Sequence, residues 1–159
     1  MVRIRRILCP VDFSPASNHA VQYAAELARS YDASLKLLHV ASPIIPASYE
    51  YPIDTTALLQ TMQKASERQM QRLLAKTERS RVNVDGAVVT GDIIGQIKDE
   101  IESTKPDLVV MGAHGKGLLD RIFLGSTAER VVRAALCPVM VIPPEKKRAA
   151  KATPRKRAT

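Results

Sequence analysis

The sequence has no tryptophan, two cysteines in 159 residues, and only 4% aromatic residues. Two cysteines are too few for a disulfide framework, and Cys9 and Cys137 form no CxxC pair. Both lie in apolar stretches, so we interpret them as small buried thiols rather than redox groups. No apolar run is long enough for a membrane span, and the first is broken by Pro10 and Asp12, too early for a signal peptide. We therefore expect a cytoplasmic protein.

The net charge of +8 is distributed unevenly along the chain. Residues 145–159 hold seven lysines and arginines and one glutamate, whereas residues 1–144 hold 17 basic and 15 acidic residues. The terminal stretch also lacks large apolar side chains, so we expect a disordered basic tail. The remaining 144 residues, in a chain with 45% hydrophobic residues, match the size and composition of one globular domain.

Short, β-branched apolar runs alternate with longer amphipathic stretches. Such alternation predicts strands that are apolar on both faces and separated by helices, hence a parallel sheet covered on both sides. With right-handed crossovers, this is a doubly wound α/β fold with five parallel strands. The expected strands are 4–11, 34–41, 82–89, 108–112 and 138–142. The expected helices are 14–31, 55–79, 93–103 and 126–136.

A glycine-containing loop follows the fourth expected strand, and ligands of such sheets bind at the carboxyl ends of strands. Four of the chain's seven glycines are Gly112, Gly115, Gly117 and Gly125, and glycine permits positive φ or close approach to a ligand. The next residues, Ser126-x-x-Glu129, match a capping box at a helix start, where free N–H groups favour anions. The spacing is compatible with a phosphate site and equally with an ordinary strand-to-helix turn.

Two widespread phosphate-binding motifs are absent from this loop. The P-loop pattern fails because Gly117 follows Lys116 and the glycine spacing is too short. The dinucleotide pattern GxGxxG fails too, and the loop follows the fourth strand rather than the first. A ligand at this loop would have to be held in another way.

The spacing Gly112-x2-Gly115-x9-Gly125-Ser126 resembles the nucleotide-binding signature of the universal stress protein family, in its ATP-binding branch. The opening ILCPVDFSPAS and the segment CPVMVIP resemble that family's first strand with its loop and its terminal strand. The resemblance covers residues 4–143. It implies the adenine-nucleotide alpha-hydrolase-like fold, with strand order 3-2-1-4-5 and a cleft between strands one and four.

The resemblance also implies roles for individual residues. Asp12 would accept hydrogen bonds from ribose hydroxyls, although an acid there could instead simply cap the following helix. The other implied residues line the adenine pocket (Pro10, Val11, Val40), meet adenosine with their backbone (Met111, Gly112), or surround the phosphates (His114, Gly115, Gly125, Ser126, Thr127). Lys116 and Arg121 could neutralise phosphate charge or be solvated loop charges.

Metal and catalytic groups are sparse in the sequence. His19 and His39 have no metal ligand at a suitable spacing, so we interpret them as structural histidines. Magnesium or manganese bridging the phosphates is compatible with the sequence, which offers no dedicated carboxylate cage. No nucleophile with a paired base, and no acid placed to orient a water, is recognisable. We expect a nucleotide-dependent stress or signalling module rather than an efficient ATPase, with slow hydrolysis left open.

Two alternative functions follow from other parts of the chain. One is a nucleic-acid-associated protein acting through the tail 145–159, although this tail has no aromatic side chains for base stacking. The other is a family member that dimerises without binding nucleotide. In the implied strand order, strand 138–142 is an apolar edge, so we expect homodimerisation there. Alternatively, the tail or the loop 42–53 covers this edge.

Overall fold

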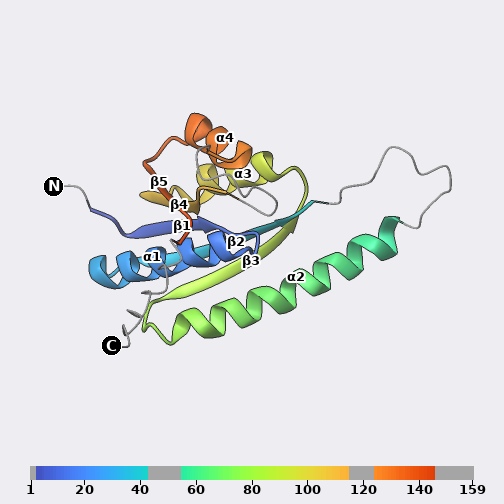
Figure 1. Cartoon of the computed structure of the whole chain (residues 1–159), viewed down its shortest axis with the longest axis horizontal. Helices are drawn as coiled ribbons and strands as arrows, with labels where there is room; N and C mark the ends of the chain where they lie inside the picture. The colour runs from blue at the N-terminus through green and yellow to red at the C-terminus, as the bar shows by residue number, and fades with distance from the viewer. Residues whose placement is uncertain (1–2, 43–54, 115–123, 146–159) are drawn as a thin grey trace, which may run out of the picture.

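Strands alternate with helices along the chain, as the hydrophobic pattern predicts (Figure 1). The computed structural model describes residues 3–42, 55–114 and 124–145. The elements are β1 (Arg6–Pro10), α1 (Pro15–Tyr31), β2 (Ser34–Ala41), α2 (Thr55–Glu78), β3 (Val84–Thr90), α3 (Ile93–Thr104), β4 (Leu108–Gly112), α4 (Ser126–Ala134) and β5 (Val139–Ile142). The basic tail lies outside the described residues apart from Glu145, the residue with which it begins.

The five strands form one parallel sheet in the order β3-β2-β1-β4-β5, which confirms the expected topology. In the centre, Ile7 of β1 is paired with Leu35 of β2 on one side and Leu108 of β4 on the other. Because the order reverses between β1 and β4, their carboxyl ends flank the topological switch point, where this fold class binds ligands.

Each face of the sheet carries its own apolar core. On one face, Ile7, Cys9, Leu35 and Leu37 pack with the buried alanines of α1 and with Met70 of α2. On the other face, the core residues come from the opposite pleats of the strands and from α3 and α4: Leu8, Leu38, Ile94, Ile97, Ile101, Val109, Met111, Ala128 and Val131. The helices therefore cover both faces, α1 and α2 on one and α3 and α4 on the other (Figure 1).

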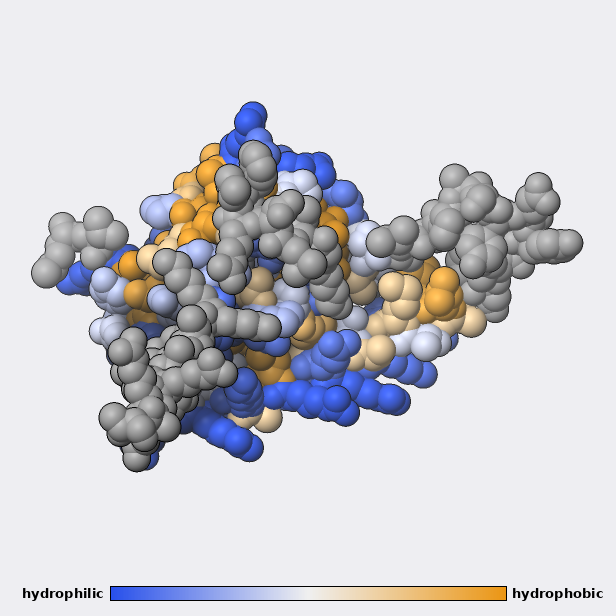
Figure 2. Space-filling model, in the orientation of Figure 1, coloured by the Kyte–Doolittle hydropathy of each residue, from blue (hydrophilic) through white to orange (hydrophobic). Residues whose placement is uncertain are grey.

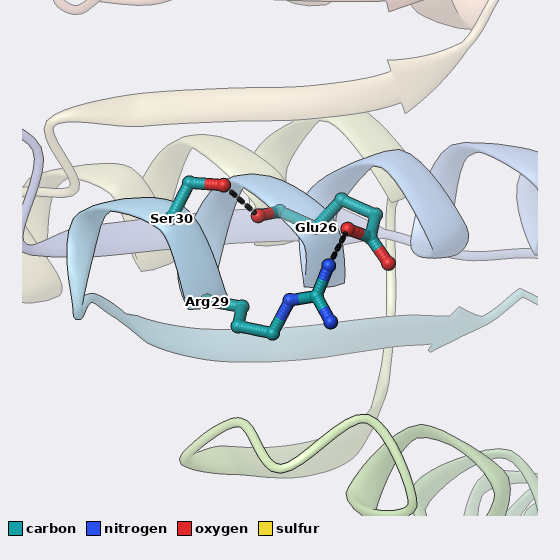
Figure 3. A network of polar contacts seen from close by, with 3 residues as sticks. All are labelled: Glu26, Arg29 and Ser30. Atoms are coloured by element: carbon teal, nitrogen blue, oxygen red, sulfur yellow. Dashed lines mark hydrogen bonds and ion pairs between the residues drawn. The ribbon is translucent and has the colours of Figure 1, made fainter.

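Helix α1 begins and ends with recognisable caps. The Ser14 side chain accepts a hydrogen bond from the Ser17 N–H, and Pro15 occupies the first turn. On the exposed side of its last turns, Arg29 pairs with the Glu26 carboxylate, and the Ser30 hydroxyl donates to the Glu26 carbonyl at 2.8 Å (Figure 3). These contacts are local to the helix, so they stabilise α1 without connecting it to the sheet.

The expected capping box at the start of α4 is wrong. The N-cap is Gly125, and its N–H donates to the Ala113 carbonyl at 2.8 Å, so the helix begins one residue earlier than the box requires. Ser126 consequently lies in the first turn, and no side chain caps the helix. The Glu129 carboxylate accepts from Arg133 at 2.9 Å rather than reaching back to the cap.

Helix α2 corrects a second expectation. The apolar spacing of the helix predicts that Leu58 lies on its inner face, but Leu58 is 41% exposed, whereas Met70 is buried against the sheet. The reason is geometric, because the amino-terminal half of α2 projects beyond the strands it covers (Figure 1). Hydrophobic colouring over this projecting half is visible at the right of Figure 2.

The two cysteines differ in their surroundings. Cys9 is fully buried, and burial raises the pKa of its thiol to about 12, so it is an inert core group as expected. Cys137 is half-buried rather than buried. The pKa of its thiol is raised, mainly by loss of solvation and to a smaller extent by the Asp107 charge. Of the helices in the described ranges, none has the length and apolar character needed to cross a membrane.

Candidate functional site

A cleft of about 520 Å³ opens at the carboxyl edge of the sheet. Its walls come from the ends of β1, β2 and β4, the first turn of α4, and residues of α2 and α3. Its volume lies in the range of small-molecule sites. It is also located at the switch point between β1 and β4, where the sequence predicts a ligand.

The turn after β1 holds Asp12 at the cleft. The Asp12 Oδ1 atom accepts a hydrogen bond from the Ser14 N–H at 2.9 Å, so this carboxylate also supports the start of α1. Phe13 has a φ of 61°, a conformation that is costly for a bulky residue. His39 holds this turn in place, since its Nδ1 donates to the Val11 carbonyl at 2.8 Å and its ring packs on Phe13.

The end of β4 and the start of α4 are joined through backbone groups. The Ala113 N–H donates to Ile142 of β5, and its carbonyl accepts from Gly125, both at 2.8 Å. A Cβ at Gly125 would lie 3.0 Å from that carbonyl oxygen. The chain therefore returns after residues 115–123 to the point where β4 ended, and the first residues of α4 line the cleft.

Two glycines of the site allow close packing of backbone segments, whereas the sequence predicts a positive φ or close approach to a ligand. Neither Gly112 nor Gly125 has a positive φ. At Gly112, a Cβ would lie 3.1 Å from backbone atoms of Ala16 at the start of α1. Both glycines thus permit close approach of one backbone segment to another, which brings β4, α1 and α4 together around the cleft.

His114 is the most unusual polar residue of the cleft. It is 9% exposed, and its Nε2 atom has no hydrogen-bond partner among the described residues. Buried side-chain nitrogens almost always have a partner, and an unpaired one costs about 1–3 kcal/mol. A ligand atom in the cleft would supply this partner.

The structure brings ten of the eleven predicted site residues to this cleft. Those lining it are Pro10, Val11, Asp12, Val40, Met111, Gly112, His114, Gly125, Ser126 and Thr127. The eleventh, Gly115, lies outside the described residues, as do Lys116 and Arg121. His19 is away from the cleft and pairs with the Pro143 carbonyl at 3.2 Å, whereas His39 lines it.

Sequence reasoning missed residues that reach the cleft from helices. Ser17 of α1 contributes its hydroxyl, 3.4 Å from the Asp12 nitrogen. Met62 and Ser66 of α2 line the cleft from another side. A signal for Ser66 was available, because it lies four residues after Met62 and four before Met70, within the apolar stripe of the helix.

The charges of the cleft limit its chemistry. Asp12 is the single acidic side chain among its described lining residues. Within the described ranges, no group of three histidine, cysteine, aspartate or glutamate side chains is placed to hold a metal ion. These residues can therefore bind and orient a polar ligand, and a divalent cation would need ligand oxygens to complete its coordination.

Comparison with known proteins identifies relatives of the whole fold. The family model described as "Universal stress protein family" matches residues 3–143. Universal stress protein MJ0531 of Methanocaldococcus jannaschii is 33% identical over 147 residues, covering 90% of this chain and 84% of that protein. Universal stress protein A homolog 1 of Coxiella burnetii is 31% identical over 143 residues, covering 87% and 95% of the two chains.

Solved structures show the same architecture. Universal stress protein UspA from Lactobacillus plantarum has a TM-score of 0.77 and 26% identity, covering 89% of this chain and 99% of its own. A universal stress protein family protein from Arabidopsis thaliana with AMP bound has a TM-score of 0.61 and 24% identity, covering 87% of this chain and 90% of its own.

Proposed function

The chain belongs to the universal stress protein family, and we propose that it is a nucleotide-binding member whose cleft takes ATP or a related adenine nucleotide. In this proposal the protein acts as a stress-response or signalling module, in which the bound nucleotide is the signal. The Arabidopsis thaliana relative with AMP bound indicates that this fold can accommodate the ligand class.

The observation that carries the proposal is the unpartnered Nε2 of His114 beside the free amino end of α4. The N-terminus of a helix attracts anions through its N–H groups and its dipole. At α4 no side chain caps these groups, and the helix and His114 line one cleft. A phosphate would satisfy the imidazole and the helix N–H groups together.

The remaining assignments are those that the family resemblance implies. The phosphates lie at His114, Gly115, Gly125, Ser126 and Thr127, and Asp12 accepts hydrogen bonds from ribose hydroxyls. The apolar residues Pro10, Val11 and Val40 pack against adenine, and Met111 and Gly112 face adenosine. A magnesium or manganese ion, if bound, would be held by the phosphates, since the described cleft has no cluster of acidic ligands.

The direct test is chemical identification of the ligand. Protein purified without added nucleotide is denatured, and the released small molecules are identified by mass spectrometry. Titration calorimetry with ATP and AMP then measures affinity on stripped protein. We expect an adenine nucleotide in the first experiment or saturable binding in the second. If no nucleotide is released and none binds at millimolar concentration, the proposal is wrong and the nucleotide-free alternative is favoured.

We also propose a homodimer through β5. This strand is at the edge of the sheet, and Met140 on it is 38% exposed. Val132 and Leu136, next to it in the chain, are 44% and 87% exposed, and hydrophobic colouring gathers over α4 and β5 in Figure 2. Pairing with a second copy would cover this edge in both subunits at once.

Sedimentation equilibrium tests the dimer. We expect a mass near twice the 17.4 kDa of one chain, and a shift toward monomer in Met140→Lys. Leu58→Lys is the control, because Leu58 is about as exposed as Met140 but lies on the projecting half of α2, away from β5. A wild-type monomer at micromolar concentration would contradict the proposal.

Removal of residues 145–159 tests the nucleic-acid alternative, since it should abolish DNA or RNA binding and leave nucleotide binding unchanged.

A further inference from the structure

Ser66 of α2 is a buried polar residue that the assignments above leave unused. It is 8% exposed and lines the cleft. Other hydroxyls of this helix bond back to their own backbone: Thr61 to the Ala57 carbonyl at 2.9 Å and Thr77 to the Leu73 carbonyl at 2.8 Å. Ser66 makes no such bond, and its hydroxyl has no hydrogen-bond partner among the described residues.

Ser66 and the phosphate-binding groups lie at opposite ends of the cleft. Helix α2 packs on β3 and β2, whereas His114 and Gly125 follow β4. In the sheet, β1 separates β2 from β4, so these two strands are about 10 Å apart. A ligand with its phosphate at α4 and its ribose at Asp12 therefore extends its base toward β2 and α2.

The chemistry of this end of the cleft suits a nucleobase. Met62, one turn before Ser66 on α2, also lines the cleft and offers an adaptable apolar surface for a flat ring. The serine hydroxyl can donate one hydrogen bond and accept others. The edge of adenine presents an amino donor next to ring-nitrogen acceptors, and either kind of atom could form a hydrogen bond with the Ser66 hydroxyl.

We propose that Ser66 hydrogen-bonds the edge of the nucleobase while Met62 packs against its ring, which makes α2 a specificity-determining wall of the site. This inference rests on the proposed nucleotide function. It adds a contact from a helix that the glycine signature does not include. It also explains why a hydroxyl interrupts the apolar stripe between Met62 and Met70.

The test compares Ser66→Ala with Thr61→Ala in AMP titrations. Alanine is the best helix former, so Ser66→Ala should fold like the wild type, which thermal unfolding checks. Losing one hydrogen bond should weaken AMP binding about 3- to 10-fold. Thr61→Ala removes an exposed hydroxyl of the same helix outside the cleft, and we expect less than about a 2-fold change.

A crystal structure of the wild type with AMP provides the second measurement. We expect the Ser66 Oγ within about 3.2 Å of a nitrogen on the base edge. Unchanged AMP affinity in Ser66→Ala, or a base lying away from α2, would overturn the inference and leave the proposed function standing. Failure of the wild type to bind either AMP or ATP would instead reject the proposed function itself.

Discussion

The two ends of the sheet each carry an aspartate, and they use it differently. At the amino end, Asp107 precedes β4 and its carboxylate accepts from the Arg5 and Arg6 N–H groups at 2.9 and 3.0 Å. At the carboxyl end, Asp12 follows β1, supports the turn through the Ser14 N–H, and lines the cleft. The first joins neighbouring strands, whereas the second faces the space where a ligand would lie.

The difference extends to the groups around each aspartate. The backbone donors at the amino end are paired with a carboxylate of the same chain. At the carboxyl end, the His114 Nε2 and the Ser66 hydroxyl have no partner in the described structure. An unpaired buried polar group such as the His114 Nε2 lowers stability, so it indicates that this end of the sheet is built for a ligand at some cost in stability. Substitutions at the two ends should therefore affect different properties.

The largest effect is expected for Gly125→Val, at the carboxyl end. The new Cβ lies 3.0 Å from the Ala113 carbonyl, and its methyl groups add bulk where α4 begins. We expect loss of measurable ATP binding together with a modest drop in melting temperature. Calorimetry and thermal unfolding measure the two changes. Gly95→Ala is the control and should bind ATP normally, since Gly95 is outside the cleft. Normal ATP binding by folded Gly125→Val would contradict the role assigned to the turn between β4 and α4.

Asp12 should show the next largest effect on binding. Asp12→Ala removes an acceptor for the ribose, and we expect a loss of about 1.5–3 kcal/mol in the free energy of ATP binding. Because it also removes the Ser14 hydrogen bond, Asp12→Asn is the sharper variant, since its amide oxygen can still accept from Ser14. If both variants bind ATP like the wild type, the ribose assignment is wrong.

His114→Leu should change binding and stability in opposite directions. Leucine removes the unpaired Nε2, so the ligand-free protein should be as stable as the wild type or more stable in urea unfolding. Nucleotide binding should weaken by about 1.5 kcal/mol, as expected for one hydrogen bond to a charged phosphate. A destabilised variant with unchanged affinity would show that His114 is only a packing residue.

Hydrophobic pattern alone predicted the sheet well. Strands 34–41 and 108–112 agree with β2 and β4 to the residue, whereas the first strand, expected over 4–11, is β1 over Arg6–Pro10. The errors lie where distant segments decide the outcome. Ser126 has the composition of a cap, but the Ala113 carbonyl places Gly125 in that position. Leu58 follows helical spacing, but local sequence carries no information about where the sheet under α2 ends.

The candidate site was also partly predictable. Residues directly after strands, such as Asp12 and His114, could be placed because parallel strands bring their carboxyl ends to one edge. The apolar stripe of α2 marks Ser66 as facing inward, but the sequence does not show that this part of the helix reaches the cleft, because that depends on how α2 packs on β2 and β3. The glycines were recognised, but the contact of Gly112 with Ala16 was not predicted, since a backbone-to-backbone contact of this kind depends on the tertiary structure.

The smallest effect is expected at the amino end, for Asp107→Asn. The N–H of Arg5, and then that of Arg6, lowers the pKa of the Asp107 carboxyl below its ordinary value. A pKa that is lower in the folded than in the unfolded chain adds stability above the unfolded value of about 4, and this is lost as pH falls through the folded value. Asp107→Asn should therefore be less stable than the wild type at pH 7, by under about 1 kcal/mol for such a partly exposed group.

Urea unfolding of both proteins at pH 7 and pH 3 checks this prediction. The stability difference between wild type and Asp107→Asn should shrink at pH 3, because the wild-type carboxylate becomes protonated and accepts the Arg5 and Arg6 hydrogen bonds less strongly. ATP affinity at pH 7 should be unchanged, since Asp107 is at the edge opposite the cleft. Weakened ATP binding in this variant would mean that the two ends of the sheet are coupled, and the division between a structural and a ligand-facing aspartate would fail.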